Sequence, residues 1–479
     1  MEYWHIIYVY LQNIFNAIGD FTWGWSLIPM LVIYGIFFTV SSNFAQFRYF
    51  GRMFRVLNPK YKPDDPKAIS GREALFLSIG GRVGGGNIAG VAVAITLGGP
   101  GAVFWMWVVA LLGMVTSIVE CTLAQLYKRT DEDGTFRGGP AMVITHGLGQ
   151  HYRWFAIIYA VCLICAFALG FNAFQGNTVA GSAFDSLGIP RVVSGVFLAA
   201  VAGFIVFGGI KRITKAADIV VPVMAFIYMG MALIIIILNI TEIPGVISDI
   251  IQNAFGLKTA VSGGIGAALS QGMRRGLFSN EAGLGSAPNV AATARVKHPV
   301  GQGISQALSV FIDTMIICSC TAFVILLGNV YQPGQTEIDG IVLTQQSLVY
   351  HLGPWVQYFL TFAILLFAFS SIIYNYYLGE NALAFMVKSN KAANYLRVAV
   401  IGMIFLGATA PGATAVFFFS DPMMGVLALV NLIALLMLFP TFTRVLDDFR
   451  TQIKEGEDRP VFHADKFPDL DLDRTAWRK

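Results

Sequence analysis

Glycine and polar residues interrupt two otherwise apolar segments of the chain, near 71–96 and 259–287. Five of the seven residues 80–86 are glycine, and Arg82 and Asn87 lie beside them. The second segment contains the run R-R-G-L-F-S-N-E-A-G-L-G-S at 274–286. A glycine inside a helix costs about 1 kcal/mol relative to alanine, and close helix packing needs small residues on one face only. We therefore predict that both helices are broken.

Two breaks of this kind predict a binding site. Non-helical backbone at membrane depth is tolerated only where it is buried in protein or lines a cavity. Freed N–H groups at the start of a half-helix attract anions, and freed carbonyls attract cations. A nucleotide site is disfavoured, because G-G-G-N-I-A-G at 84–90 matches a dinucleotide fingerprint only loosely and lacks a strand–turn–helix context. The sequence also has no Walker motif.

Polar residues in other apolar segments are further candidates, since such groups are costly inside a membrane. Asn172 and Gln175 are three residues apart, so they share a helix face and could line a cavity or bond between helices. Ser370 and Ser371 could bond to their own helix as readily as to a ligand. Asn375, in the same segment, is harder to attribute to packing.

Four acidic residues in or near these segments could carry protons. Glu120 and Glu380 could equally lie close to the cytoplasmic interface. Asp218 follows Lys215 near the start of a segment, which favours a surface pair. Asp313 lies deeper, and there a structural bond to a polar or basic group is favoured over a proton relay.

Arg82 in the first glycine run must find a partner, because an isolated buried charge is expensive. A carboxylate or a carbonyl would serve. Glu281 is the nearest candidate, since it occupies the equivalent place in the second interrupted segment. The two residues would form a structural gate, or Arg82 would contribute to an anionic site.

The elements that must position these residues are membrane helices. Of 479 residues, 56% are hydrophobic and 13% are charged, against about 25% charged in ordinary soluble domains. The mean hydropathy is +0.66. These values exclude an ordinary soluble enzyme, a disordered chain and a disulfide scaffold. Eleven apolar stretches approach the roughly 20 residues that cross a bilayer: 27–45, 71–96, 101–127, 154–184, 191–210, 216–240, 259–287, 301–328, 346–386, 395–418 and 423–442. Residues 244–256 predict a helix along the interface.

Basic residues predict the orientation of these spans. With the N-terminus outside, 29 of the 32 lysines and arginines fall on the inner side, as the positive-inside rule requires. Seven of them lie in the loop 46–72, and Arg274 and Arg275 are counted on the inner side of the seventh span. The tail 443–479 mixes basic with acidic residues and two prolines, which favours a solvated cytoplasmic tail.

The breaks fall in spans two and seven, so five spans separate them. They then occupy equivalent places in two repeats of opposite topology, which indicates a secondary transporter with its site near the midplane. We predict an all-α integral membrane protein with an N-terminal segment and extra helix at 1–46. A first five-helix repeat follows at 47–240, an inverted second repeat at 241–442, and the tail at 443–479.

Other chemistries find little support. The five cysteines lie in apolar stretches, where packing is favoured over a metal or redox pair, and the six histidines are scattered. No nucleophile set or paired catalytic carboxylates occur, so we expect no enzyme. We also expect no organic cofactor, no nucleic-acid binding and no obligate protein partner. The lipid bilayer and a small solute are the expected partners.

The motifs closely resemble those of the alanine or glycine:cation symporter family, the sodium:alanine symporters of bacteria. The resemblance covers almost the whole chain and rests on five motifs: G-R-V-G-G-G-N-I-A-G-V-A at 81–92, G-G-P-G-A-V-F-W-M-W at 98–107, F-R-G-G-P at 136–140, R-G-L-F-S-N-E-A-G-L-G-S-A-P at 275–288 and N-Y-Y-L-G-E at 375–380. It implies a leucine-transporter-type fold, with a five-plus-five inverted repeat after one extra N-terminal helix. It also implies uptake of small neutral amino acids coupled to Na⁺.

The resemblance also implies site residues. The substrate carboxylate would meet backbone N–H groups, and side chains of spans four, seven and nine would complete the pocket; these residues are Gly84, Gly85, Gly86, Gln175, Phe278, Ser279, Ser371 and Asn375. A sodium ion would lie between spans two and nine. Its ligands would be the carbonyls of Gly80, Val83 and Phe367 with the hydroxyls of Ser370 and Ser371.

Two departures from the family pattern bear on specificity. The family often has threonine at the position of Gly85, and glycine–tryptophan at the positions of Tyr374 and Asn375. We expect a Na⁺-driven symporter for alanine, glycine or both, in the bacterial inner membrane with the C-terminus in the cytoplasm. The alternative is proton-coupled transport of the same substrates through Asp313 or another buried carboxylate.

Overall fold

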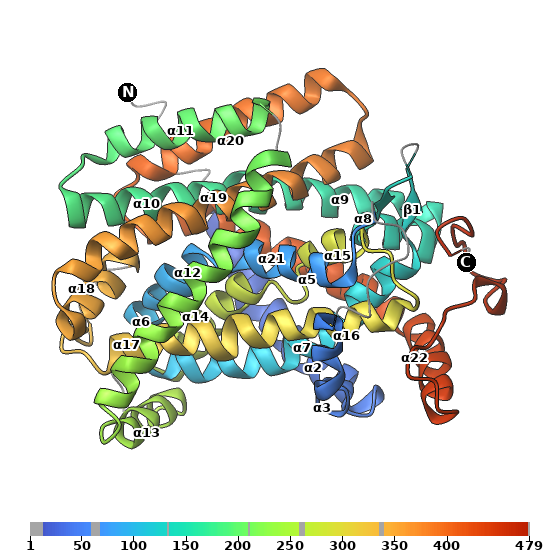
Figure 1. Cartoon of the computed structure of the whole chain (residues 1–479), viewed down its shortest axis with the longest axis horizontal. Coiled ribbons are helices and arrows are strands. Elements are labelled where there is room, and N and C mark those ends of the chain that lie inside the picture. Colours follow the sequence, from blue (N-terminus) through green and yellow to red (C-terminus); the bar gives the residue numbers. More distant parts are fainter. Residues whose placement is uncertain are drawn as a thin grey trace.

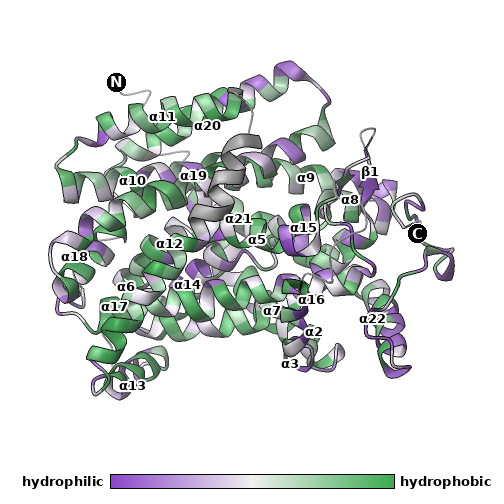
Figure 2. Cartoon of the chain, viewed as in Figure 1, coloured by the Kyte–Doolittle hydropathy of each residue, from purple (hydrophilic) through white to green (hydrophobic). Residues whose placement is uncertain are grey.

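The computed structural model describes residues 13–58, 68–131, 134–208, 211–257, 264–334 and 340–477. These residues are mostly helical, which confirms the all-α prediction, and the strands form one small hairpin, β1 (Arg129–Thr130) with β2 (Phe136–Arg137). Figure 1 shows long helices packed side by side, with α13 and α18 at one end and β1, α22 and the C-terminus at the other. Hydrophilic residues gather around that second end, which we call the tail end (Figure 2).

The helices of the first half run from the N-terminal segment to a short helix after the sixth predicted span. They are η1 (Asp20–Leu27), α2 (Ile28–Ser41), α3 (Ala45–Arg48), α4 (Phe50–Met53), η2 (Phe54–Leu57), α5 (Gly71–Arg82), η4 (Gly86–Gly90), α6 (Val91–Gly98), α7 (Gly101–Leu126), α8 (Pro140–Val143), η5 (Ile144–Leu148), η6 (Gln150–Tyr152), α9 (Arg153–Leu163), η7 (Ile164–Phe171), α10 (Asn172–Leu187), α11 (Arg191–Gly208), α12 (Lys211–Leu238) and α13 (Ile243–Ala254).

The second half begins after residues 258–263. Its helices are α14 (Gly264–Asn280), α15 (Ser286–Ala291), α16 (Pro299–Val310), η8 (Phe311–Cys318), α17 (Ser319–Leu326), α18 (Gly340–Leu352), α19 (Trp355–Met386), α20 (Asn390–Thr409), α21 (Ala413–Met437), α22 (Phe439–Lys454) and η9 (Ala464–Lys466).

Seven helical stretches of the described residues are long and apolar enough to cross a membrane, and an eighth results if Pro222–Leu238 and Ile243–Ala254, bent by 104°, count as one. Other predicted spans hold shorter or broken helices, among them α5 with α6 and α14 with α15. The count of eleven membrane spans therefore stays a prediction. The short helix expected at 244–256 is present as α13.

Three predicted spans have the wrong boundaries. The stretch 346–386 is divided between α18 and α19, because Gly353 adopts φ +89° and Pro354 follows it. The stretches 395–418 and 423–442 are displaced, since α20 ends at Thr409 and α21 begins at Ala413. Both turns consist of glycine, proline and alanine, so hydropathy alone does not separate them from the apolar helices on either side.

Small residues allow the helices to approach closely. α7 packs along α14 and α16, and α10 packs along α19 and α20. At one contact, a Cβ on Gly407 would lie 1.9 Å from the carbonyl oxygen of Ala173. Glycine is required there because α10 and α20 meet backbone to backbone, as small residues permit in membrane proteins.

The C-terminal residues differ from the solvated tail that we predicted. After α22 the chain turns back, and Phe462, Phe467 and Ala476 are buried. The backbone N–H of Phe462 donates to the carbonyl of Lys297 over 2.8 Å. The charges of the tail engage partners on the body of the protein, so its composition did not reveal that it is packed.

The basic-residue count also needs a correction. Arg274 and Arg275 lie in α14 before the second break, on the half of the molecule away from the tail end, and both approach Asp421 of α21. Arg275 is buried and paired with Asp421, so its charge is not that of an exposed loop residue. Residues 60, 62 and 67, counted in the first inner loop, lie outside the described residues.

Candidate functional site

The first predicted break is present between α5 and η4. α5 begins with a capping box, in which Glu73 N–H donates to Ser70 Oγ and Ser70 N–H donates to Glu73 Oε2. It ends at Arg82, and Val83 is extended, with φ −67° and ψ 107°. The next helix begins at Gly86. Its first N–H groups have no partner within their own helix, as at every helix start.

The second break separates α14 from α15 and has a different backbone. Glu281 adopts φ +56°, and Gly283 and Gly285 adopt φ +92° and +80°. A residue other than glycine in the left-handed region costs about 1–3 kcal/mol and persists only where its surroundings hold it. Contacts to the Glu281 side chain therefore have to stabilise this turn.

One of those contacts comes from the first break, as the sequence predicted. Arg82 Nε lies 3.7 Å from Glu281 Oε2, and both side chains are buried. Ser286 Oγ and Tyr374 Oη donate to the same carboxylate over 2.5 and 3.2 Å. Arg82 Nη1 donates to Ser309 Oγ over 2.5 Å. The guanidinium thus joins the two breaks, although its Nε and Nη2 have no hydrogen-bond partner among the described residues.

A second link between the breaks centres on Asn87 and Asp313. Asn87 Oδ1 accepts the N–H of Gly84 over 2.9 Å, and Asn87 Nδ2 donates to Ser279 Oγ over 2.9 Å. Asp313 accepts from Asn87 and from Ser279, each over 2.6 Å. Thr314 Oγ1 donates to the same carboxylate over 3.0 Å. Asp313 therefore has the structural partners that we favoured, at the junction of both broken helices.

The predicted substrate residues converge on the glycine run. A Cβ on Gly84 would lie 2.6 Å from Ser371 Oγ, and one on Gly85 would lie 3.0 Å from Gln175 Oε1. A Cβ on Gly86 would lie 3.1 Å from the Phe278 ring. Side chains of α10, α14 and α19 thus reach the bare backbone of the first break, where only glycine leaves room.

Gln175 is the polar residue of this group whose hydrogen bonding is incomplete. Its side chain is buried, and Oε1 has no partner among the described residues. A buried acceptor without a donor costs about 1–3 kcal/mol, so this oxygen is suited to an ammonium or another donor from a ligand.

Aromatic rings form the wall beside Gly85 and Gly86. The Phe278 ring centroid lies 4.2 Å from Phe171, 5.0 Å from Phe174 and 5.1 Å from Phe417. The contacts with Phe174 and Phe417 lie within the range of favourable aromatic pairs, and the contact with Phe171 is closer. The apolar wall stands close to the glycines and leaves little width for a ligand side chain.

The predicted cation residues are only partly in contact with one another. Ser370 Oγ donates to the carbonyl of Gly80 over 2.8 Å. Ser371 Oγ donates over 3.1 Å to the carbonyl of Gly81, which was not in the predicted set. Val83 is the extended residue after α5, and Phe367 lies one turn before the serines in α19. All of the predicted ligand atoms are neutral oxygens, the donors that hard cations prefer.

Asn375 does not contact the glycine run through a hydrogen bond. Its Nδ2 donates to Asn172 Oδ1 over 3.2 Å, and Asn172 Nδ2 donates to the Ala168 carbonyl. The two asparagines therefore join α10 to α19, which is the interhelical bonding that the sequence left open for Asn172.

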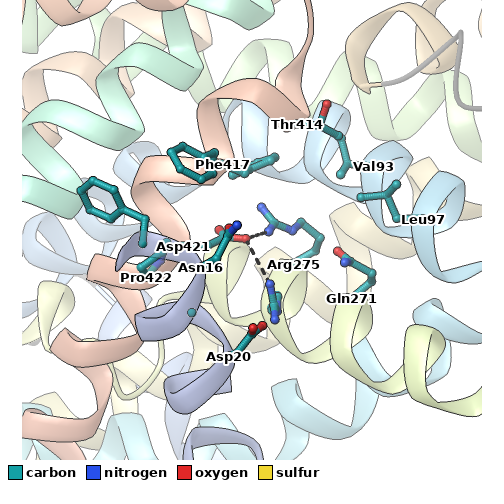
Figure 3. Close-up of a pocket in the computed structure, with 14 residues that line it drawn as sticks. Asn16, Asp20, Val93, Leu97, Gln271, Arg275, Thr414, Phe417, Asp421 and Pro422 are labelled. Atoms are coloured by element: carbon teal, nitrogen blue, oxygen red, sulfur yellow. Dashed lines mark hydrogen bonds and ion pairs between the residues drawn. The ribbon is translucent and has the colours of Figure 1, made fainter. Parts of the chain in front are cut away.

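A pocket of about 270 Å³ opens beyond the aromatic wall, away from the tail end. Arg275 forms an ion pair with Asp421, and its guanidinium lies 3.6 Å from the Phe417 ring centroid. Figure 3 shows both charged side chains pointing toward one another from α14 and α21. The lining comprises Phe15, Asn16, Gly19, Asp20, Val93, Leu97, Gln271, Arg274, Arg275, Thr414, Phe417, Phe418, Asp421 and Pro422. Phe417 thus separates this pocket from Phe278.

The other acidic candidates have separate roles. Glu120 is buried in α7, where it accepts from the Gly283 N–H over 3.3 Å and from Asn431 Nδ2 over 3.0 Å. It supports the second break rather than lying at an interface. Glu380 accepts from Tyr376 Oη and pairs with Arg397. Asp218 has a side chain outside the described residues.

Sequence reasoning missed two site residues. The first is Tyr374, which the sequence marked only as a departure from the family pattern. A Cβ on residue 81 would lie 2.4 Å from its ring, so a tyrosine at 374 requires a glycine at 81. Asn87 was noted only as a neighbour of the glycines, although its position three residues after Gly84 is the spacing of a side chain that caps backbone. No group of three or more histidines, cysteines or carboxylates in the described residues could hold a metal ion.

Comparisons with known proteins agree with this architecture. The profile of the sodium:alanine symporter family matches residues 8–464. The chain is 47% identical to the amino-acid carrier protein AlsT of Bacillus subtilis over 96% of this chain and 97% of that protein. It is 45% identical to the probable sodium/glutamine symporter GlnT of the same organism, over 95% and 94%. It is 36% identical to a sodium/proton-dependent alanine carrier protein of Bacillus sp. PS3, over 83% and 92%.

The fold has a counterpart among solved structures. MhsT in complex with L-phenylalanine superposes with a TM-score of 0.54 over 77% of this chain and 89% of MhsT, at 15% identity. This likeness confirms the leucine-transporter-type fold and carries nothing about the ligand.

Proposed function

Because the chain belongs to the sodium:alanine symporter family, we propose that it couples inward movement of Na⁺ to uptake of alanine, glycine or both by alternating access. It is a membrane transporter for amino acids and not an enzyme. In this proposal the inverted repeats are 47–240 and 241–442, in the bacterial inner membrane. The N-terminus lies outside, and the tail end faces the cytoplasm.

The observation that carries the substrate proposal is the unpartnered Gln175 Oε1 beside Gly85. The N–H of Gly84 already donates to Asn87, which leaves the N–H groups of Gly85 and Gly86 for the substrate carboxylate. The ammonium would donate to Gln175 Oε1. The Phe278 ring lies close to Gly86. It would leave room for the side chain of glycine or alanine and exclude larger side chains.

We assign the cation to the junction of α5 and α19. The Ser370 and Ser371 hydroxyls and the Gly80 carbonyl already lie together there, and rotation of the two hydroxyls would free lone pairs for Na⁺. The cation would stabilise the unwound residues that follow α5. Occupancy of this site would therefore favour the backbone geometry that binds the amino acid, which is the coupling a symporter needs.

A second candidate is proton coupling through Asp313. Its carboxylate bonds to Asn87 of the first break and to Ser279 of the second, so loss or gain of one proton would alter the link between them. Relatives named sodium/proton-dependent alanine carriers support testing this alternative. Sodium remains the first choice because the junction of α5 and α19 offers only neutral oxygens.

Uptake of radiolabelled alanine and glycine into proteoliposomes tests the proposal. We expect accumulation under an inward Na⁺ gradient and little with choline at equal ionic strength. Accumulation driven by an inward proton gradient without Na⁺ would favour Asp313 coupling. Uptake that is indifferent to every cation gradient would contradict symport.

The pocket at Arg275 and Asp421 is the proposed outer entrance. It lies across Phe417 from Phe278, so opening that ring contact would connect the pocket with the glycine run. The ion pair and the ring would close the site from this end, while the cluster at Arg82 and Glu281 closes it from the other.

A further inference from the structure

The C-terminal residues 456–477 pack on the tail end of the helices that enclose the site. Phe462 donates its N–H to Lys297, and its ring lies 4.9 Å from Trp477 and 5.2 Å from Phe467. Lys297 belongs to the short connection between α15 and α16. This C-terminal segment, so defined, is therefore attached directly to the chain that follows the second half of the broken helix.

Trp477 continues this contact onto the end of α7. Its indole Nε1 donates to the Leu126 carbonyl over 3.4 Å. Leu126 lies in the last turn of α7, where carbonyl groups have no partner within the helix. The Lys128 ammonium lies 4.5 Å from the Trp477 ring and 4.2 Å from the Phe136 ring. The lysine is completely buried between the two rings.

Lys128 and Gln125 hold the connection after α15 against α7. Lys128 Nζ donates to the Ala294 carbonyl over 3.0 Å and to Gln125 Oε1 over 2.9 Å. Gln125 Nε2 donates to Ala294 over 2.9 Å and also to Ala291. Burial lowers the pKa of Lys128 to about 7, with Arg295 adding to the shift and Asp473 opposing it. The rings of the C-terminal segment and the hairpin thus cover a costly buried amine.

Three alternate carboxylates fasten the same segment. In D-L-D-L-D at 469–473, Asp473 accepts the N–H of Thr130 over 2.8 Å. Asp471 lies 2.9 Å from Arg129 and 2.6 Å from His146, and Asp469 pairs with Arg444 over 2.6 Å. Each exposed pair contributes little by itself, but together the three carboxylates fix the register that brings Trp477 onto Lys128.

We propose that residues 456–477 form a clamp that holds α15 against α7 and must loosen before the site can open toward the tail end. This proposal rests on the alternating-access function above. The clamp acts at the connection 291–298, between α15 and α16. Trp477 is accordingly a positioning residue, since it contacts neither the glycine run nor the serines of α19.

A native cysteine reports on this movement. Cys121 of α7 is buried, and its apolar cluster consists of Cys121 with Ala287 and Ala291 of α15. Separation of α15 from α7 would expose the thiol. Opening on the side of Arg275 would leave this contact intact, because that pocket lies before the second break.

The test measures maleimide labelling of Cys121 in a full-length variant whose other four cysteines are alanine. We expect Trp477→Ala to raise the labelling rate about fivefold, the factor for losing about 1 kcal/mol of cation–π and packing energy. It should also change the maximal uptake rate more than the apparent KM for alanine. Trp154→Ala is the matched control, because Trp154 is an exposed tryptophan of α9, and its labelling rate should equal that of the parent.

Asp471→Asn provides a milder variant should Trp477→Ala not fold, and we expect a labelling increase of about twofold from it. Unchanged labelling in a folded Trp477→Ala or Asp471→Asn protein would overturn the clamp. The labelling needs no transport, so faster labelling without Na⁺-driven uptake would reject the proposed function and leave the clamp standing.

Discussion

The two breaks interrupt their helices in different ways. In the first break, Gly84, Gly85 and Gly86 have no Cβ, and side chains of three other helices fill the space beside them. In the second break, contacts to one side chain hold the backbone: Arg82, Ser286 and Tyr374 keep Glu281 at φ +56°. The difference suggests that the first break is shaped for a ligand and the second for holding the two half-helices together.

Removing the contact between Arg82 and Glu281 should have the largest effect on stability. Arg82→Ala leaves the Glu281 carboxylate buried without its counter-charge, which costs about 3–5 kcal/mol. We expect a large fall in the thermal unfolding temperature of the purified protein. Replacing both residues, as Arg82→Met with Glu281→Leu, should recover part of the loss. If Arg82→Ala unfolds at the parent's temperature, the pair does not hold the second break.

Filling the first break should affect binding before stability. Gly84→Ala places a methyl group 2.6 Å from Ser371 Oγ, and overpacking of this kind costs about 1–3 kcal/mol. We expect the apparent KM for alanine to rise about tenfold or more. The matched control is Gly90→Ala, whose Cβ would lie at an ordinary 3.8 Å from the Phe278 ring. Equal KM values for the two variants would argue against a ligand at the first break.

The cation ligands should give a smaller and more selective effect. Ser370→Ala with Ser371→Ala removes two hydroxyls that contact Gly80 and Gly81. We expect the Na⁺ concentration for half-maximal uptake to rise about tenfold, at about 0.5–1.5 kcal/mol for each lost interaction. Ser305→Ala, whose hydroxyl bonds to its own helix at Gly301, serves as control. An unchanged Na⁺ dependence would place the cation elsewhere.

Asp313→Asn should have the smallest effect if Na⁺ is the coupling ion. The amide keeps an acceptor for Asn87, and the loss is confined to bonds worth about 0.5–1.5 kcal/mol. We expect Na⁺-driven alanine uptake to stay within about tenfold of the parent. Abolished uptake under both Na⁺ and proton gradients, in a protein that unfolds at the parent's temperature, would instead make this carboxylate part of the coupling.

Sequence could predict the features that arise from local composition. The glycine run predicted the first break, and equivalent placement in the two repeats predicted the pairing of Arg82 with Glu281. It could not predict contacts set by packing between distant helices. Arg275 and Asp421 are 146 positions apart, and basic-residue counting treated Arg275 as a flanking charge although it is buried in an ion pair.

The C-terminal segment shows a second limit. Its mixed charges and prolines are typical of solvated tails, and nothing local indicates that Asp471 would meet Arg129 and His146. Phe462 and Trp477 were the available signal, because aromatic residues in a charged segment usually pack against something.

The central claim, that cation and amino acid stabilise one unwound backbone, is tested most directly by equilibrium binding. The dissociation constant of alanine for the detergent-solubilised protein would be measured over a range of Na⁺ concentrations, with choline keeping the ionic strength constant. The account predicts that affinity for alanine rises with Na⁺ and, reciprocally, that affinity for Na⁺ rises with alanine by the same factor. An alanine dissociation constant that does not change with Na⁺ would contradict it.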